Sequence, residues 1–206
     1  MKVIAINGSS HKNGTTFQAM QTVIQELEAE NIEVEVIHIG SAPIQGCIGC
    51  GKCSEIGKCV FDNDPVNYCA EKLKAADGVL IGSPVYYAGI NGALKAFLDR
   101  LFYSLPSSRY KVGAAVIALR RSGGMAAFHQ INTYFSISQM IVTPNLYWNI
   151  IHGNSAEEAL QDDEGMLIMK TLGRNMAWLL KAVDMGKKAL PLPETDKRVW
   201  TNFIRD

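Results

Sequence analysis

Short runs of β-branched and aliphatic residues alternate along the chain with longer segments in which apolar residues recur every three or four positions. The short runs predict strands, and the periodic segments predict helices. Residues 112–119 are apolar almost throughout, which is expected of a strand buried on both faces of a parallel sheet. The predicted strands are residues 3–7, 34–39, 79–82, 112–119 and 141–147. The predicted helices are residues 16–29, 68–75, 91–102, 124–139 and 166–188.

This alternation predicts an α/β fold, a doubly wound parallel sheet with helices on both faces. We expect a single domain over residues 1–206, since the chain contains no repeat, low-complexity segment or linker. Residues 40–66 lack a periodic pattern, contain Gly and Pro, and predict a long loop rich in cysteine. Ligands of such sheets bind at the carboxyl ends of the strands. The loops after the first, third and fourth predicted strands are therefore the candidates for a binding site.

The charge of the chain is balanced, with 20 Lys and Arg residues against 20 Asp and Glu residues. A chain without net positive charge attracts phosphates weakly, so we expect neither nucleic acid nor a membrane surface as a partner. No apolar run approaches the roughly 20 residues of a membrane-spanning helix. Residues 1–8 predict a first strand and a turn rather than a signal peptide. We therefore expect a cytoplasmic protein.

The loop after the first predicted strand, residues 8–16, has the composition of a phosphate-binding turn. Its small residues leave backbone N–H groups free, and the following helix N-terminus adds the positive end of a dipole. The hydroxyls of Ser9, Thr15 and Thr16 are further candidate donors. The loop is not a Walker loop, because Gly14 is followed by Thr15 rather than Lys, and no G-x-G-x-x-G follows the strand. An ordinary helix-capping turn is the alternative interpretation.

The loops after the third and fourth predicted strands have features of a site for a flat ring. Residues 82–89 read Gly-Ser-Pro-Val-Tyr-Tyr-Ala-Gly, and a Pro followed by paired aromatics suits a ring bound edge-on to backbone groups. The alternative is that Tyr86 and Tyr87 simply cover the end of the strand. In residues 120–124, two glycines permit close backbone approach, whereas at least one of the two arginines is expected to be solvated.

Four of the five cysteines follow the pattern Cys-x2-Cys-x2-Cys-x5-Cys within the predicted loop. Structural disulfides are not expected in a reducing compartment, so clustered thiols indicate metal or redox chemistry. Four thiolates are the number that a 4Fe–4S cluster needs. Zinc is one alternative, although zinc sites more often pair two separated Cys-x2-Cys knuckles, and free thiols are another. The candidate metal ligands are Cys47, Cys50, Cys53 and Cys59, whereas Cys69 is predicted to be a small buried hydrophobe.

Three of these segments together resemble the NAD(P)H-dependent FMN reductases of the flavodoxin-like superfamily. They are residues 9–16, Gly-Ser-Pro-Val-Tyr-Tyr at 82–87, and Asn-Gly-Ala-Leu-Lys-Ala-Phe-Leu-Asp-Arg at 91–100. With the cysteine loop included, the chain is similar to their iron–sulfur flavoprotein branch, over roughly residues 1–152. The resemblance implies a five-stranded sheet of order 2-1-3-4-5, FMN as cofactor, NAD(P)H as co-substrate and a candidate 4Fe–4S cluster. It also implies a homodimer or homotetramer.

By position, the resemblance assigns the first of these loops to the FMN phosphate and the other two to the isoalloxazine ring. The phosphate would contact Ser9, His11, Lys12, Asn13, Gly14, Thr15 and Thr16. The ring would rest on Ser83, Pro84, Val85, Tyr86, Tyr87, Ala88 and Gly89, with Ser122, Gly123 and Gly124 near its other edge. Asp99 and Arg100 match an Asp-Arg pair of the family, which we interpret as structural.

The sequence thus predicts an FMN-dependent oxidoreductase. Electrons from NAD(P)H, or from reduced ferredoxin, would pass through FMN to a quinone, a nitro or azo compound, or an electron carrier. No catalytic acid–base group is expected, because the cofactor itself performs the hydride chemistry. The alternative is a non-catalytic electron-transfer iron–sulfur flavoprotein. The zero net charge argues against that alternative, since carriers of the flavodoxin type usually have an acidic docking surface.

Overall fold

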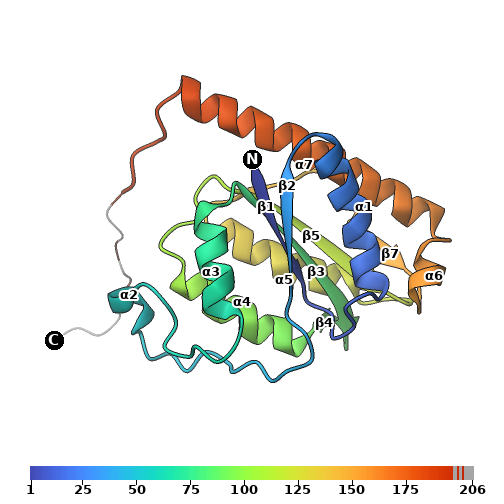
Figure 1. Ribbon diagram of the computed structural model, residues 1–206, viewed down its shortest axis with the longest axis horizontal. Coiled ribbons are helices and arrows are strands. Elements are labelled where there is room, and N and C mark those ends of the chain that lie inside the picture. The colour runs from blue at the N-terminus through green and yellow to red at the C-terminus, as the bar shows by residue number, and fades with distance from the viewer. Residues whose placement is uncertain (197–198, 200, 202–206) are drawn as a thin grey trace.

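Strands and helices alternate along the chain in the computed structural model, which describes residues 1–196, 199 and 201 (Figure 1). The strands are β1 (Lys2–Asn7), β2 (Glu33–His38), β3 (Gly78–Tyr86), β4 (Gly89–Ile90), β5 (Val112–Leu119), β6 (Ile141–Val142) and β7 (Ile150–His152). The helices are α1 (Thr15–Ala29), α2 (Cys53–Ile56), α3 (Val66–Ala75), α4 (Gly92–Ser104), α5 (Gly124–Ile137), α6 (Ala156–Ala159) and α7 (Asp163–Ala189). Within the part of the chain that the structure describes, none of these helices is long and apolar enough to cross a membrane.

The main path of the sheet is parallel and runs in the order β2-β1-β3-β5-β6. Val3 of β1 lies opposite Val34 of β2 on one side and opposite Gly78 of β3 on the other. Gly78 in turn lies opposite Val112 of β5. With β5 as the fourth strand of the predicted set, this is the 2-1-3-4-5 order of a flavodoxin-like sheet. β4 adds a short antiparallel hairpin to the end of β3.

The fifth strand position differs from the single strand predicted over residues 141–147. Two short strands, β6 and β7, pair instead with the start and the end of β5. Between them, Pro144 has no N–H to add to a ladder, and the Asn145 amide donates a 3.0 Å hydrogen bond to the carbonyl oxygen of Ile168 in α7. The prediction of a continuous strand was therefore wrong. Two apolar residues at the end of the predicted strand, Leu146 and Tyr147, are exposed.

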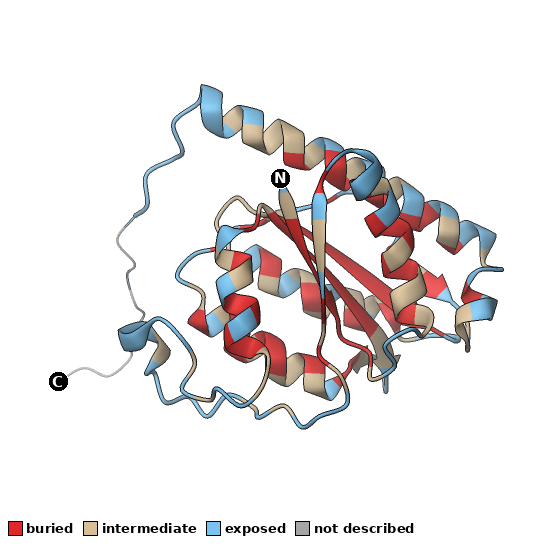
Figure 2. Cartoon of the chain, in the orientation of Figure 1, coloured by how far each residue is buried: buried red, intermediate tan, exposed pale blue. Residues whose placement is uncertain are grey.

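Residues of the strands alternate between two hydrophobic cores, one on each face of the sheet. In β1, Ile4 and Ile6 pack with α3, α4 and α5, whereas Val3 and Ala5 pack with α1 and α7. β5 is buried at every position, as its uninterrupted apolar run predicts. Figure 2 shows the buried strands between the two layers of helices. All five predicted helices form, with ends within three residues of those predicted, and cover both faces of the sheet.

The cysteine-rich loop follows β2 and returns to the domain at α3. Figure 1 shows it running past α4 to α2 and back. The short helix α2 was not predicted. It ends at Gly57, whose φ of 72° is the left-handed conformation that favours glycine after a helix. The prediction of an otherwise irregular loop between the second strand and the next long helix is confirmed.

Candidate functional site

The loop between β1 and α1 is held in shape by its own polar groups. Asn7 accepts a 3.1 Å hydrogen bond from the Ser9 amide and donates one of 3.0 Å to the carbonyl oxygen of Lys12. The Ser9 hydroxyl accepts a 3.1 Å bond from the His11 amide. His38 Nε2 lies 2.8 Å from the Ser9 carbonyl oxygen, and since a carbonyl only accepts, this nitrogen must carry the proton. The turn is therefore shaped mainly by Asn7, Ser9 and His38.

The first turn of α1 directs backbone donors towards the mouth of this loop. Gly14 is the N-cap residue and makes no side-chain cap, and the first-turn N–H groups have no carbonyl partner within the helix. Such donors, together with the positive end of the helix dipole, suit an anion. The predicted phosphate contacts divide by exposure: Ser9 and Thr16 are buried, Gly14 and Thr15 are half-buried, and His11, Lys12 and Asn13 are exposed.

The loop after β3 is joined directly to the loop after β1. The Gly8 amide donates a 2.8 Å hydrogen bond to the carbonyl oxygen of Gly82, and a Cβ on Gly8 would lie 2.7 Å from that oxygen. The side-chain amide of Asn91 donates to the Gly8 carbonyl oxygen at 2.8 Å, and the backbone N–H of Asn91 donates to the Ser83 hydroxyl at 3.2 Å. The Ser83 hydroxyl thus belongs to the network that joins the two loops.

The loop after β3 also contacts the loop after β5. Tyr87 and Ala88 form the two-residue turn between β3 and β4, with φ values of 48° and 60°. A hairpin turn with positive φ at both positions normally contains Asn and Gly, so a Tyr-Ala pair is an unusual choice. Gly123, with φ of 87°, approaches this turn so closely that a Cβ would lie 2.9 Å from Ala88 Cα. The glycine at 123 is therefore required by both its conformation and its neighbour.

The two tyrosines do not cover the end of β3. Tyr86 is 47% exposed, and Tyr87 is fully exposed at the tip of the hairpin. Arg120 and Arg121 are exposed, as expected of solvated arginines, and Ser122 is exposed beside them. Of the remaining predicted ring contacts, Ala88 is exposed, and the others are half-buried or buried: Ser83, Pro84, Val85, Gly89, Gly123 and Gly124. The predicted residues after β1, β3 and β5 thus gather at one edge of the sheet, with the middle loop touching both others.

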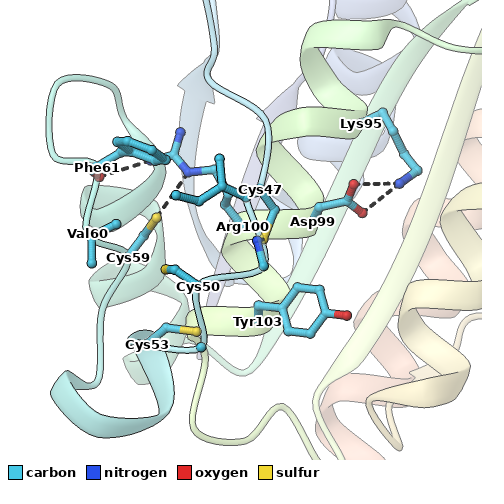
Figure 3. Close-up of a pocket in the computed structure, with 13 residues that line it drawn as sticks. Cys47, Cys50, Cys53, Cys59, Val60, Phe61, Lys95, Asp99, Arg100 and Tyr103 are labelled. Atoms are coloured by element: carbon cyan, nitrogen blue, oxygen red, sulfur yellow. Dashed lines mark hydrogen bonds and ion pairs between the residues drawn. The ribbon is translucent and has the colours of Figure 1, made fainter.

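The four clustered cysteines line a single cavity of about 580 Å³ between their loop and α4 (Figure 3). All are free thiols, of which Cys47 and Cys50 are exposed and Cys53 and Cys59 are half-buried. The facing wall is formed by side chains of α4, with Lys95, Asp99, Arg100 and Tyr103.

Cys59 is attached to the domain by two buried side chains. The Asn67 amide pairs with its backbone in both directions, accepting from the Cys59 N–H at 2.9 Å and donating to its carbonyl oxygen at 3.0 Å. Arg100 Nε donates a 3.1 Å hydrogen bond to the Cys59 sulfur, which Figure 3 shows as a dashed line. The same guanidinium forms an ion pair with Asp64, whose side chain is 4% exposed.

Asp99 and Arg100 are adjacent in the sequence but belong to different networks. Asp99 accepts from Lys95 and from the Tyr134 hydroxyl. Burial and the bond to Asp99 raise the pKa of Tyr134 to about 12, so this group is a neutral phenol. Burial lowers the pKa of Arg100, but its bonds to Asp64 and Cys59 outweigh this and raise the pKa overall. Both side chains are thus held by other protein side chains and both line the cysteine cavity, and the structural role of the pair stays a prediction.

The four cysteines have the right donor atoms for an iron–sulfur group, but their side chains are not yet gathered into a closed ligand set. Four thiols face one cavity, which is the donor type and number of a 4Fe–4S site. Across residues 1–196, 199 and 201, however, no three Cys, His, Asp or Glu side chains are gathered as a ready site for one metal ion. Cys69 lies apart from the set: it is fully buried in the core, as predicted, and burial raises its pKa to about 12.

Sequence reasoning missed several residues that organise these sites. Asn91 had a readable signal, because an Asn directly before an apolar helix is a strong N-cap. His38 and Asp64 had none, since each bonds to a residue far away in the sequence. Asn67 bonds to residues only five to eight positions earlier, but no motif in that irregular segment marks it. Arg100 was recognised as part of a family pair, but its partner sulfur could not be read from the sequence.

The chain is similar to known proteins in both sequence and fold. Residues 1–155 match the family described as NADPH-dependent FMN reductase. The chain is 34% identical to an iron–sulfur flavoprotein of Methanocaldococcus jannaschii, over 89% of this chain and 99% of that one. Among solved structures, it resembles a flavodoxin from the domain Archaea with a TM-score of 0.60 and 20% identity, over 88% of this chain and 99% of the other. It also resembles FerB, a flavoenzyme NAD(P)H:(acceptor) oxidoreductase from Paracoccus denitrificans, with a TM-score of 0.66 and 16% identity, over 88% and 97% of the two chains.

Proposed function

The chain belongs to the NADPH-dependent FMN reductase family, and from this premise we propose that it oxidises NAD(P)H, or reduced ferredoxin, and reduces a second acceptor through bound FMN. The acceptor would be a quinone, a nitro or azo compound, or an electron carrier. The observation that carries the proposal is the meeting of three loops at one sheet edge: Gly8 bonds to Gly82, and Gly123 packs against Ala88. When bound, FMN supplies the redox chemistry, and the protein supplies its position and surroundings.

The phosphate of FMN would occupy the mouth of the β1–α1 loop. The first-turn N–H groups of α1 and the hydroxyls of Thr15 and Thr16 are its proposed donors. This choice is supported by the uncapped helix start at Gly14 and by the fixed shape of the turn. Ser9 would act mainly by shaping the loop, because it is buried and its hydroxyl already accepts from the His11 amide.

The isoalloxazine ring would lie between the β3–β4 hairpin and the β5–α5 loop. Backbone groups of residues 84–89 and 122–124 would contact its edges. Exposed Tyr86 and Tyr87 stand beside this position, available to a ligand or a neighbouring copy. A nicotinamide would bind against the open face of the ring, which agrees with the lack of a separate dinucleotide fingerprint in the sequence. The resemblance further implies two or four copies of the chain in solution, which light scattering would measure.

The cysteine cavity would hold a 4Fe–4S cluster on Cys47, Cys50, Cys53 and Cys59. Support comes from four free thiols around one cavity and from relatives that are iron–sulfur flavoproteins. The helix α4 connects this cavity to the proposed flavin site: Asn91 bonds to the β1–α1 loop, and Arg100 lies about 13 Å further along the helix axis. Zinc and metal-free thiols are the competing states, and metal and sulfide analysis of anaerobically purified protein distinguishes all three.

Steady-state oxidation of NADH and NADPH by FMN-loaded protein, with a quinone as acceptor, tests the proposed activity. Turnover with either nicotinamide is the expected result. If neither a nicotinamide nor reduced ferredoxin supports turnover of the acceptor, while the protein retains FMN and still exchanges single electrons with ferredoxin, the non-catalytic electron-transfer protein is the correct function. Purified protein that binds no FMN would contradict both.

A further inference from the structure

Cys59 differs from the other three clustered cysteines in how firmly the fold holds it. Its backbone is paired on both sides with the amide of buried Asn67, and its sulfur accepts a hydrogen bond from buried Arg100. Cys47 and Cys50 instead lie on the exposed part of the loop, where the Cys47 sulfur accepts only a local bond of 3.5 Å from the Gly49 amide. Among the residues that the structure describes, Cys59 is thus the one member of the set with a fixed, charged donor on its sulfur.

Every N–H group of the Arg100 guanidinium is hydrogen-bonded. Its Nε–H donates to Cys59, and its two terminal nitrogens donate to the carbonyl oxygens of Gln45 and Phe61 and to both carboxylate oxygens of Asp64. A guanidinium has five N–H groups in a rigid fork, so each has one acceptor here. Because the acceptors fix the plane of the group, the direction of the Nε–H towards sulfur is fixed as well. A lysine could not reproduce this set of contacts.

Besides orienting the Arg100 guanidinium, Asp64 balances its charge. Its carboxylate forms a buried ion pair with Arg100, and the two side chains are 4% and 1% exposed. The pair as a whole is close to neutral, so its long-range field at the cavity is small. What remains at Cys59 is the short, directional N–H···S bond.

We propose that Arg100 is a positioning residue that raises the reduction potential of the iron–sulfur group through its hydrogen bond to the Cys59 sulfur. This inference rests on the proposed 4Fe–4S site. A donor to a ligand sulfur stabilises the state with more negative charge, which is the reduced state, and hydrogen bonds to sulfur are one of the factors that set such potentials. Arg100 therefore has two roles. It holds the cysteine-rich loop through Gln45, Phe61 and Asp64, and it gives one of the four proposed ligands, Cys59, a fixed hydrogen-bond donor.

A charge-balanced variant tests this proposal by redox titration of the anaerobic protein. In Arg100→Met combined with Asp64→Asn, the donor is lost while the net charge of the pair is unchanged. We expect the equilibrium constant for reduction to fall about tenfold, which is about 59 mV for a one-electron couple. Asp64→Asn alone is the matched control: it keeps Arg100 and its bond to sulfur, so its potential should not fall. Equal potentials in the double variant and the wild type, both with full iron, overturn the proposal.

A second measurement needs no variant and decides the matter if the double variant loses its iron. Pulsed EPR of the reduced wild-type protein, labelled with 15N-arginine, should show hyperfine coupling to an arginine nitrogen. An absent coupling in protein with full iron overturns the role of Arg100 and leaves the proposed cluster intact. Wild-type protein purified anaerobically without iron overturns the cluster itself, and this inference with it.

Discussion

The side-chain amide of Asn91 donates a 2.8 Å hydrogen bond to the carbonyl oxygen of Gly8, a residue 83 positions earlier in the chain. The same side chain caps α4 by accepting from the Ala93 amide at 2.9 Å. Asn91 is 7% exposed, so neither bond can be replaced easily by water. One buried residue therefore starts a helix and fixes the entrance of the proposed phosphate loop.

Replacing Asn91 by Ala should weaken both stability and FMN binding. The lost cap costs about 1 kcal/mol, and the unpaired Gly8 carbonyl costs about 1 to 3 kcal/mol more. Urea denaturation of the FMN-free protein measures the loss of stability, and fluorescence titration with FMN measures the loss of FMN affinity. Asn91→Asp is the control that separates the two bonds, since it keeps an acceptor for the cap but has no donor for Gly8. If Asn91→Asp binds FMN as tightly as wild type, the bond to Gly8 is not needed for the site.

A carboxylate at position 15 should expel FMN without unfolding the protein. In Thr15→Glu the new charge would lie at the proposed phosphate position, and we expect the dissociation constant to rise by about tenfold or more. Acidic residues in the first turn of a helix are favourable by about 0.3 to 1 kcal/mol, so the melting temperature of the FMN-free protein should not fall. Thr15→Gln has nearly the same shape without the charge. Equal FMN affinity of the Glu and Gln variants would mean that the phosphate binds elsewhere.

The contact between Gly123 and Ala88 predicts a strict requirement for glycine. Gly123→Ala would place a Cβ 2.9 Å from Ala88 Cα in a residue with φ of 87°. Strain of this kind costs about 1 to 3 kcal/mol and should displace the hairpin, so FMN affinity should fall as well. At Gly92 a Cβ would meet no atom within 4 Å, so Gly92→Ala should be neutral or stabilising by up to about 1 kcal/mol. A Gly123→Ala protein as stable as Gly92→Ala contradicts the close approach.

Most of the sheet could be predicted from the sequence because its buried strands are short, locally recognisable runs of apolar residues. The apolar run at 112–119 is expected of a strand covered on both faces, and it is buried at every residue. The same reasoning failed over part of 141–147, where Leu146 and Tyr147 are apolar but exposed. Hydrophobicity indicates burial in most segments, and here it did not. Pro144 was the local signal against a strand.

The functional loops could be predicted as loops, but not as a connected site. The Ser/Thr-rich turn and the glycines at 123 and 124 are local features of the sequence. The bonds that join the loops, such as those of Gly8 to Gly82 and of Asn91 to Gly8, link residues that are distant in the chain. Such pairings depend on the packing of whole elements, which no local pattern records.

The cysteine set predicts a clear contrast between two alanine variants. Cys50→Ala removes one of four proposed ligands, so iron and the broad visible absorbance beyond the flavin bands should be lost while FMN remains bound. Cys69→Ala removes a thiol that is buried in the core and outside the cavity, so its iron content should equal that of wild type. Elemental analysis and the visible spectrum of anaerobically purified proteins measure both. A Cys50→Ala protein with full iron contradicts the assignment of Cys50 as a ligand.

Burial of Cys69 predicts how its thiol reacts and how stability changes in alkali. Burial raises its pKa to about 12, against about 9 for an ordinary thiol. At pH 9 an unfolded Cys69 is half ionised, whereas the native thiol is protonated in all but about one molecule in a thousand. In metal-free native protein, iodoacetamide at pH 9 should therefore modify exposed Cys47 and Cys50 rapidly and Cys69 only after denaturant is added. Peptide mass mapping over time distinguishes the sites.

The same shift fixes the direction of the pH effect on stability. Because the folded pKa is higher than the unfolded one, the contribution of the Cys69 thiol is complete below pH 9 and is lost as the pH rises from about 9 towards 12. Tyr134, whose pKa is also raised to about 12, acts in the same direction. The free energy of unfolding should therefore decline above pH 9, and it should decline less steeply in Cys69→Ala, which retains Tyr134 but lacks the thiol. Identical slopes in the two proteins would mean that Cys69 titrates in the folded state as it does in the unfolded chain.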